Sequence, residues 1–191
     1  MLQTRKTRFT PAEYLAMETV ADTKSEYYNG EIFAMSGGTP DHSLIAVNIA
    51  GALGQQLAPT PCRVLNSDMR LNVARSGLYT YPDVMVICGK VELVKGRNDT
   101  VTNPLLIVEV LSESTRDYDR GAKFNFYKQI PALQEYVVVE SERPHVECYR
   151  RTADDKWLVE IHEELDAAVK LEAVACEMSL REIYSKASWL S

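Results

Sequence analysis

The chain has 191 residues, of which 46% are hydrophobic, and its formal net charge at pH 7 is -6. This length allows one sizeable hydrophobic core and hardly a second, so we expect a single domain spanning residues 1–191. The negative charge argues against a protein that coats nucleic acid non-specifically, because such binding depends on many lysines and arginines. It does not exclude DNA as a substrate, since a basic face can coexist with an acidic whole.

The sequence contains neither a membrane span nor a paired-cysteine motif. Apolar runs fall short of the roughly 20 residues needed to cross a bilayer, and Thr4–Arg8 lead into no apolar signal segment. We therefore expect a cytoplasmic protein. The four cysteines lack the spacing of a zinc site or redox pair, so we expect reduced, structural thiols. They are Cys62, Cys88, Cys148 and Cys176.

Two helices are predicted near the N-terminus by the same signal. Thr10 is followed by Pro11, which is typical of a capped helix with proline in its first turn. Thr39 is followed by Pro40, and apolar residues then recur at helical spacing through residues 45–57. The second pattern predicts an amphipathic helix that packs one face against the core.

A hairpin and a half-exposed strand are predicted around the second helix. Asn29-Gly30 favours a type I′ turn and predicts a β-hairpin formed by residues 26–28 and 31–35. Residues 62–73 alternate with a period of two, which predicts one strand with an apolar face and a solvated face. The solvated face would carry Asp68, Arg70 and Asn72.

Two branched, apolar runs are expected to form the centre of a sheet. Residues 84–87 and 105–108 lack alternation, as strands buried on both faces do. A long helix follows them, capped by Ser112 or Ser114 and running to about Gln129. Later strands are predicted at residues 136–139, 145–149 and 157–161, and a short helix at 179–184. This order predicts a mixed α/β fold, with helices flanking a central mixed sheet and an N-terminal hairpin.

Glu109 is the most informative residue, because it continues the apolar run 105–108 and is followed by Val110 and Leu111. Burying an isolated carboxylate costs several kcal/mol, so it must be neutralised, paired with a cation or bound to a metal. Alternatively, Glu109 lies at the exposed end of its strand and pairs with a lysine or arginine. Asp83 opens the other buried run, and the two carboxylates together would suit a hard cation such as Mg²⁺ or Mn²⁺.

These residues resemble the PD-(D/E)XK nuclease superfamily and, more closely, the Uma-type restriction endonuclease family. The resemblance covers most of the chain. It rests on Glu26-Tyr27-Tyr28-Asn29-Gly30-Glu31, Gly37-Gly38, His42, Asp83, Glu109, Asp119, Lys123 and Tyr127. It implies a restriction-endonuclease-like core and hydrolysis of DNA phosphodiester bonds with Mg²⁺, or with Mn²⁺. A homodimer would allow two sites to cut two strands.

The sequence departs from the superfamily at the lysine. The superfamily places it two residues after the second acidic residue, where this chain has Leu111. The family resemblance implies that Lys123 replaces it from the following helix. Asp119, Lys123 and Tyr127 are spaced i, i+4, i+8 and share one helical face. The alternative is an ordinary surface pair of Asp119 with Lys123, worth about 0.3–0.5 kcal/mol.

The resemblance also implies a role for each remaining candidate. Asp83 and Glu109 would hold the metal, with the carbonyl of Val110 as a further ligand, and Lys123 would orient or deprotonate the attacking water. Glu26 would bind metal or position water, unless it is an exposed hairpin glutamate. His42 would meet a phosphate, unless it only makes a local hydrogen bond.

A non-catalytic role is the second hypothesis from the sequence. A nuclease fold can persist as a module that binds DNA or protein, and the displaced lysine and the acidic charge are compatible with that role. Such a module would keep its function after Asp83→Ala, whereas an enzyme would lose it. Motifs for a phosphate-binding loop, a nucleophile elbow or a zinc site are missing from the sequence.

Overall fold

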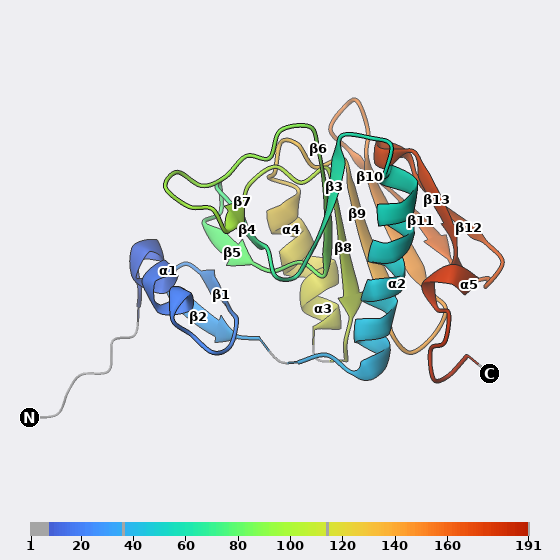
Figure 1. Ribbon diagram of the computed structural model, residues 1–191, viewed down its shortest axis with the longest axis horizontal. Coiled ribbons are helices and arrows are strands. Elements are labelled where there is room, and N and C mark those ends of the chain that lie inside the picture. Colours follow the sequence, from blue (N-terminus) through green and yellow to red (C-terminus); the bar gives the residue numbers. More distant parts are fainter. Residues whose placement is uncertain (1–7, 36, 114, 191) are drawn as a thin grey trace, which may run out of the picture.

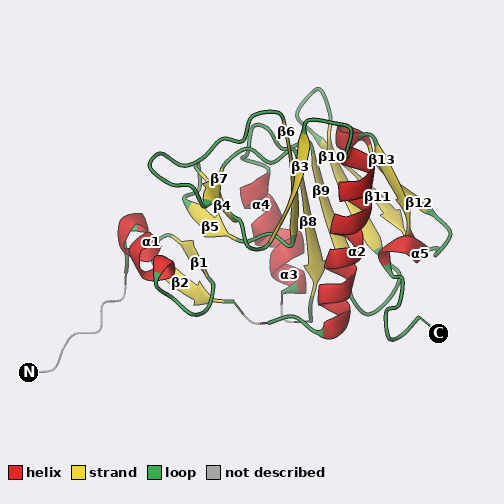
Figure 2. Ribbon diagram, viewed as in Figure 1, coloured by secondary structure: helices red, strands yellow, loops and turns green. Residues whose placement is uncertain are grey.

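The computed structural model describes residues 8–35, 37–113 and 115–190 (Figure 1). Two large β-sheets lie side by side, beside a small two-stranded one, and the largest sheet carries helices on both faces (Figure 2). The helices are α1 (Pro11–Thr19), α2 (Pro40–Leu57), α3 (Arg116–Tyr118), a π-helical segment η1 (Asp119–Lys123), α4 (Phe124–Tyr127), a 3₁₀ segment η2 (Glu172–Val174) and α5 (Leu180–Ile183).

The larger sheet has six strands in the order β11-β10-β9-β8-β6-β3. Strands β8 and β9 are parallel and the other neighbours are antiparallel, so the sheet is mixed as predicted. The two runs expected at its centre are β6 and β8, and both are buried. The bounds are β3 (Cys62–Asn66), β6 (Val84–Cys88), β8 (Leu106–Leu111), β9 (Glu135–Glu140), β10 (Val146–Arg151) and β11 (Trp157–His162).

Two apolar layers cover this sheet. On one face, α2 packs through Ile45, Ile49, Leu53 and Leu57 together with α5 and a small hairpin. That hairpin consists of β12 (Ala168–Leu171) and β13 (Cys176–Ser179). On the other face, α4 packs through Phe124 and Tyr127. Polar side chains from both layers meet at the end of the sheet where β6 begins and β8 nears its end.

The smaller sheet has five strands in the order β2-β1-β5-β4-β7. Its hairpin turns at Asn29 and Gly30, whose φ angles of 48° and 90° are those of the predicted type I′ turn. Helix α1 begins at Pro11 after the predicted cap Thr10. The bounds are β1 (Ser25–Tyr28), β2 (Glu31–Ala34), β4 (Arg70–Val73), β5 (Leu78–Thr80) and β7 (Thr100–Val101).

The prediction of one strand over residues 62–73 is wrong. The Asn66 side chain accepts the backbone N–H of Asp68, and the Asn66 carbonyl accepts the N–H of Met69, which makes a turn between β3 and β4. The two strands therefore enter different sheets. Arg70 and Asn72 are buried rather than solvated, and they donate to the Tyr81 hydroxyl and the Leu78 carbonyl. Asp68 lies in the turn and remains exposed.

The expectation of four reduced cysteines is also wrong for one pair. Cys62 and Cys88 stand opposite each other in the antiparallel register of β3 and β6 and form a disulfide. Cys148 and Cys176 are buried free thiols, as expected. The 26-residue separation of the bonded pair matches no sequence motif, because the pairing arises from strand register.

The disulfide is expected to stabilise the fold through the loop it closes. Replacing both Cys62 and Cys88 with serine should lower the free energy of unfolding by about 3 kcal/mol in oxidising buffer, since the unfolded chain regains loop entropy. Urea titration followed by fluorescence measures this difference. In reducing buffer the two proteins should be nearly equal. Equal stability in oxidising buffer as well would mean that the thiols do not pair in solution.

The helix predicted from Ser112 or Ser114 to Gln129 is present but irregular. Its first part begins at Arg116 after Thr115, which makes no side-chain cap, and Ser114 lies outside the described residues. The π-helical segment η1 then separates α3 from α4. Across the described residues, every helix is too short or too polar to span a bilayer.

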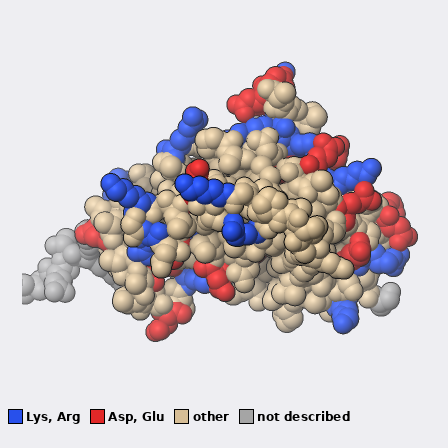
Figure 3. Space-filling model, turned by 45° about the horizontal axis from the view of Figure 1, so that its top comes forward, with Lys and Arg blue, Asp and Glu red and all other residues tan. Residues whose placement is uncertain are grey.

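Charged side chains are dispersed over the surface. In the face presented by Figure 3, lysines and arginines stand among uncharged residues and do not merge into one continuous stripe. This distribution agrees with the net charge of -6. A broad electrostatic platform for duplex DNA is therefore not visible on this face.

Candidate active site

Asp83 and Glu109 meet where β6 begins and β8 nears its end. Val84 pairs with Val108 in the antiparallel register, so Asp83 lies across from Glu109. The Asp83 carboxylate accepts the backbone N–H of Val110 at 2.8 Å. Glu109 is buried within β8, with only 3% of its surface exposed. Glu109 therefore does not lie at an exposed strand end, as one alternative from the sequence had it. The pairing with a lysine that the same alternative expected is present.

Lys123 contacts three carboxylates from different elements. Its Nζ lies 2.9 Å from Glu109 Oε1, 3.2 Å from Asp119 Oδ1 and 3.3 Å from Glu26 Oε1. Lys123 is itself buried. The Asp119–Lys123 pair is therefore not an ordinary surface pair. Tyr127 donates its hydroxyl to the same Glu109 oxygen at 2.7 Å, so both contacts fall on Oε1.

Glu26 reaches this cluster from the smaller sheet. It lies on β1 and is buried, unlike an exposed hairpin glutamate. The Thr80 hydroxyl donates to Glu26 Oε1 through a short hydrogen bond, and the Tyr118 hydroxyl donates to Oε2 at 3.2 Å. Sequence reasoning missed Thr80 and Tyr118. Neither belongs to a pattern that indicates such a contact, because both meet Glu26 only through packing of the two sheets.

The cluster holds more negative than positive charge. Burial raises the pKa of Glu109 to about 8, and the Asp119 and Asp83 carboxylates add to this effect against the opposing Lys123 ammonium. Desolvation would lower the pKa of Lys123, but its charged neighbours, with Glu109 foremost, raise it well above the ordinary value. Lys123 is therefore a permanent cation here. Because its pKa is raised, the Glu109 carboxyl group carries a proton near neutral pH.

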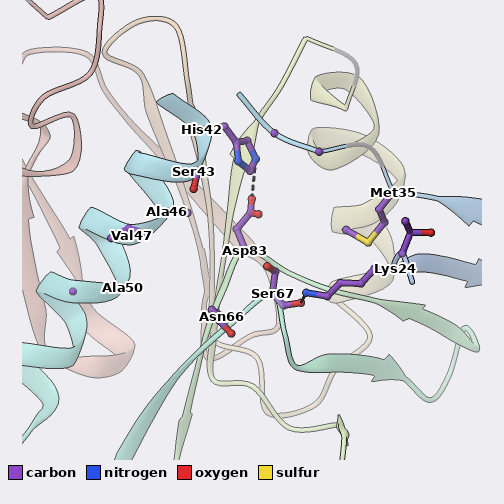
Figure 4. Close-up of a pocket in the computed structure, with 14 residues that line it drawn as sticks. Lys24, Met35, His42, Ser43, Ala46, Val47, Ala50, Asn66, Ser67 and Asp83 are labelled. Carbon is purple, nitrogen blue, oxygen red and sulfur yellow. Dashed lines mark hydrogen bonds and ion pairs between the residues drawn. The ribbon is translucent and has the colours of Figure 1, made fainter. Parts of the chain in front are cut away.

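His42 approaches Asp83 from the opposite layer. It lies in the first turn of α2, where its N–H is capped by Thr39, and its Nε2 is 3.4 Å from Asp83 Oδ2 (Figure 4). Hydrogen bonding to Asp83 raises the pKa of His42 against desolvation, and a hydrogen bond with the Val110 backbone adds to the rise. A Cβ at Gly38 would stand 2.6 Å from His42 Nδ1, so this ring position requires glycine there.

A cavity of about 810 Å³ opens beside Asp83 and His42. One wall is the side of α2, where small residues leave room (Figure 4). Lys24, Asn66 and Ser67 line the opposite side. The Lys24 ammonium donates to the Ser67 carbonyl at 3.0 Å and pairs with Asp68 at 2.6 Å. One end of the cavity thus carries the Asp83 carboxylate, and the other end carries the Lys24 ammonium.

The donor set suits a hard cation better than zinc. Among the described residues, no group of three or more His, Cys, Asp or Glu has the arrangement of a metal site. Two carboxylates are what Mg²⁺ usually takes from a protein, with water completing its shell. One buried oxygen, Asp119 Oδ1, also accepts no hydrogen bond within the described part of the chain. This oxygen is ion-paired with the Lys123 ammonium, which Glu109 and Glu26 also contact, so three carboxylates share one lysine. The excess of negative over positive charge in the cluster fits a bound cation.

The chain matches a known family along most of its length. The sequence profile of Uma2, described as a putative restriction endonuclease family, matches residues 11–181. The chain belongs to the Uma2 family. The resemblance seen in the sequence is thereby confirmed.

Relatives of this Uma2 chain include two uncharacterized proteins of Synechocystis. The protein slr1290 is 35% identical over 179 residues, which cover 93% of this chain and 92% of that protein. The protein sll1609 is 40% identical over 150 residues, which cover 78% and 85%. A crystal structure titled as a putative nuclease belonging to DUF820, from Anabaena variabilis, has the same fold. Its TM-score is 0.75 at 19% identity, with 96% of this chain and 99% of that chain covered.

In this Uma2 protein, the position of the expected lysine belongs to the core. Leu111 is fully buried and packs with the layer that contains Tyr127. A charged side chain there would lie in an apolar cluster. The ammonium that contacts Glu109 comes instead from Lys123 on η1, as the family resemblance implies.

Proposed function

We propose that this Uma2 protein is a Mg²⁺-dependent endonuclease that hydrolyses DNA phosphodiester bonds. One observation carries the proposal: Asp83 and Glu109 converge from neighbouring strands, and Lys123 lies 2.9 Å from Glu109. Two carboxylates can hold a divalent cation, and that cation together with the lysine would offset the charge of a phosphate and place water beside it. We also propose a cytoplasmic location.

Asp83 and Glu109 would hold the ion, with the Val110 carbonyl as a third ligand. The N–H of Val110 points to Asp83, and the C=O of a strand residue points to the same side as its N–H. Glu109 would use Oε2, because Lys123 and Tyr127 both contact Oε1. When bound, Mg²⁺ polarises a phosphoryl oxygen and lowers the pKa of water.

Lys123 would orient the attacking water and stabilise negative charge on the phosphate. Its permanent charge makes it a poor proton acceptor, so we assign the proton of the water to a carboxylate. We assign this step to Glu26, which contacts Lys123, stands outside the metal pair and approaches the cluster from the smaller sheet. The water oxygen forms a bond to phosphorus as Glu26 takes its proton, the P–O bond to the leaving sugar oxygen breaks, and that oxygen gains a proton from solvent water.

The cavity beside Asp83 would receive the DNA strand next to the cleaved bond. Its volume of about 810 Å³ admits a short stretch of one strand, and Lys24 would contact a neighbouring phosphate. His42 would donate to a phosphate oxygen from the first turn of α2, where the helix dipole also favours an anion. Contacts of this local kind need no basic stripe on the surface.

Incubation of the purified protein with plasmid, linear duplex and single-stranded DNA tests the proposal. We expect nicks or breaks with Mg²⁺ or Mn²⁺ and none with EDTA. A protein that binds these DNAs but cleaves none under any metal condition would instead be the non-catalytic module.

Metal binding is expected to strengthen with pH through about 8. The folded-state pKa of Glu109 is raised, so its contribution to stability is present at low pH and lost as pH rises through about 8 without metal. Mg²⁺ favours the ionised carboxylate, so it should raise the melting temperature more at pH 9 than at pH 6. Scanning fluorimetry measures the shift. Glu109→Gln cannot ionise, and an equal pH dependence in that variant would assign the effect to another group.

A further inference from the structure

Strand β11 is an exposed edge of the larger sheet. It ends the strand order, and no described strand pairs with its outer side. Three large apolar side chains on it are exposed: Leu158 (58%), Val159 (49%) and Ile161 (58%). An edge with six residues in strand conformation and apolar side chains on both faces is a template for another strand.

The hydrogen-bonding groups that β11 offers can be assigned from its inner neighbour. The N–H of Thr152 bonds to the carbonyl of Lys156, so even-numbered residues from Lys156 onward direct their backbone groups to β10. The odd-numbered residues Trp157, Val159 and Ile161 direct theirs outward. A docking strand must therefore pair with these three residues.

We propose that β11 pairs antiparallel with β11 of a second copy of this chain, across a two-fold axis at Leu158. This register puts Leu158 opposite its own copy and Trp157 opposite Val159 of the second copy. Lys156 then faces Glu160 of the second copy, and the symmetry forms that ion pair twice. The contacts of Leu158 and the Lys156–Glu160 pairs lie on one face of the continued sheet, and the contact of Trp157 with Val159 lies on the other face.

Charge complementarity selects this occupant and this register. Centring the axis on Glu160 would oppose two glutamates, and centring it on Val159 would put Leu158 beside a glutamate. Within the chain Lys156 pairs with Asp154 and Glu160 pairs with Arg150. Their side chains are nevertheless 78% and 53% exposed, so both can also reach a partner. Residues 156–160 thus carry both charges of the pair, so a second copy of this chain is complementary to the first. An unrelated strand would need a lysine and a glutamate at the same spacing.

The two active sites would stay open and act separately. Strand β8, which carries Glu109, is separated from β11 by β9 and β10. A two-fold axis perpendicular to the sheet reverses strand direction, so the two Glu109 residues would lie toward opposite ends of a twelve-stranded sheet. Dimerisation through β11 therefore differs from a dimer that brings two sites onto one cleavage position.

Charge reversal tests the pairing. We expect wild type to sediment as a concentration-dependent dimer. Lys156→Glu and Glu160→Lys should each raise the dimer Kd about tenfold or more, because like charges then face each other twice. The double variant should restore dimerisation. A monomeric wild type, a dimer indifferent to both single changes, or a double variant that stays monomeric would each overturn the proposal.

A proline pair controls for folding. Val159→Pro removes an outward N–H and should abolish the dimer while the melting temperature stays near that of wild type. Leu158→Pro removes an inward N–H and should lower the melting temperature. If Val159→Pro folds and still dimerises, the edge is not the interface. Metal-dependent cleavage per site should be unchanged in Lys156→Glu, so a failure of the proposed activity would not be mistaken for a failure of the dimer.

Discussion

Replacing Asp83 with alanine is expected to lower the rate of Mg²⁺-dependent DNA cleavage by at least about a thousandfold, since losing the metal removes several kcal/mol of transition-state stabilisation. Asp83 is one of only two carboxylates we assign to the ion. The same change should abolish the rise in melting temperature on adding Mg²⁺. Plasmid nicking measured beside scanning fluorimetry checks both results.

Two control variants separate catalysis from folding. Asp83→Asn keeps an oxygen that can accept the Val110 N–H, so it should fold like wild type and still fail to cleave. Asp166→Ala removes an exposed carboxylate that pairs with Arg181, and it should cleave normally. Equal nicking by wild type and Asp83→Ala would show that another site, or a contaminating nuclease, produces the cleavage.

Replacing Lys123 with methionine is expected to cost about 3–5 kcal/mol of unfolding free energy in Mg²⁺-free buffer at pH 8. Methionine has a similar length, but it leaves Glu109, Asp119 and Glu26 without their shared cation in a buried place. The loss should shrink at pH 5, which lies below the raised pKa of Glu109, because the protonated Glu109 carboxyl needs no cation. Urea titrations at the two pH values measure the difference.

The double variant Lys123→Met/Glu109→Gln should be more stable than Lys123→Met, because one of the stranded charges is removed with its partner. Lys128→Met serves as the matched control, because Lys128 directly follows α4. Lys128 lies 5.0 Å from the Phe124 ring centroid and is not part of the cluster, so its loss should cost no more than about 1 kcal/mol. A similar cost for both lysines, or a cost for Lys123 independent of pH, would contradict the buried-cation role.

Local signals in the sequence predicted much of the fold. Thr10, Thr39 and Asn29-Gly30 determine their own conformations through caps and a turn, so the two helices and the hairpin were predictable. The buried carboxylate Glu109 was conspicuous because it continues an apolar strand. The pairing of Asp83 with Glu109 needed the further expectation that the two strands are neighbours.

The remaining errors arise from contacts that the sequence does not encode locally. Arg70 alternates as a solvated residue would, but the rings of Tyr81 and of Tyr14 on α1 cover it. Cys62 and Cys88 pair only because β3 and β6 align them. Glu26 reaches Lys123 only because the hairpin packs beside η1. In each case the partner is distant in sequence and depends on tertiary packing.

The π-helical segment Asp119–Lys123 has a consequence for how such a site is recognised from sequence. A π turn holds one residue more than an α turn, and removing that residue would rotate the following side chains by about 100°. The extra residue of the π turn therefore sets the direction in which Lys123 and Tyr127 point toward Glu109. The ammonium beside Glu109 thus comes from a helix and not from the strand, so a comparison based on the spacing of the acidic residue and the lysine along the sequence would overlook it.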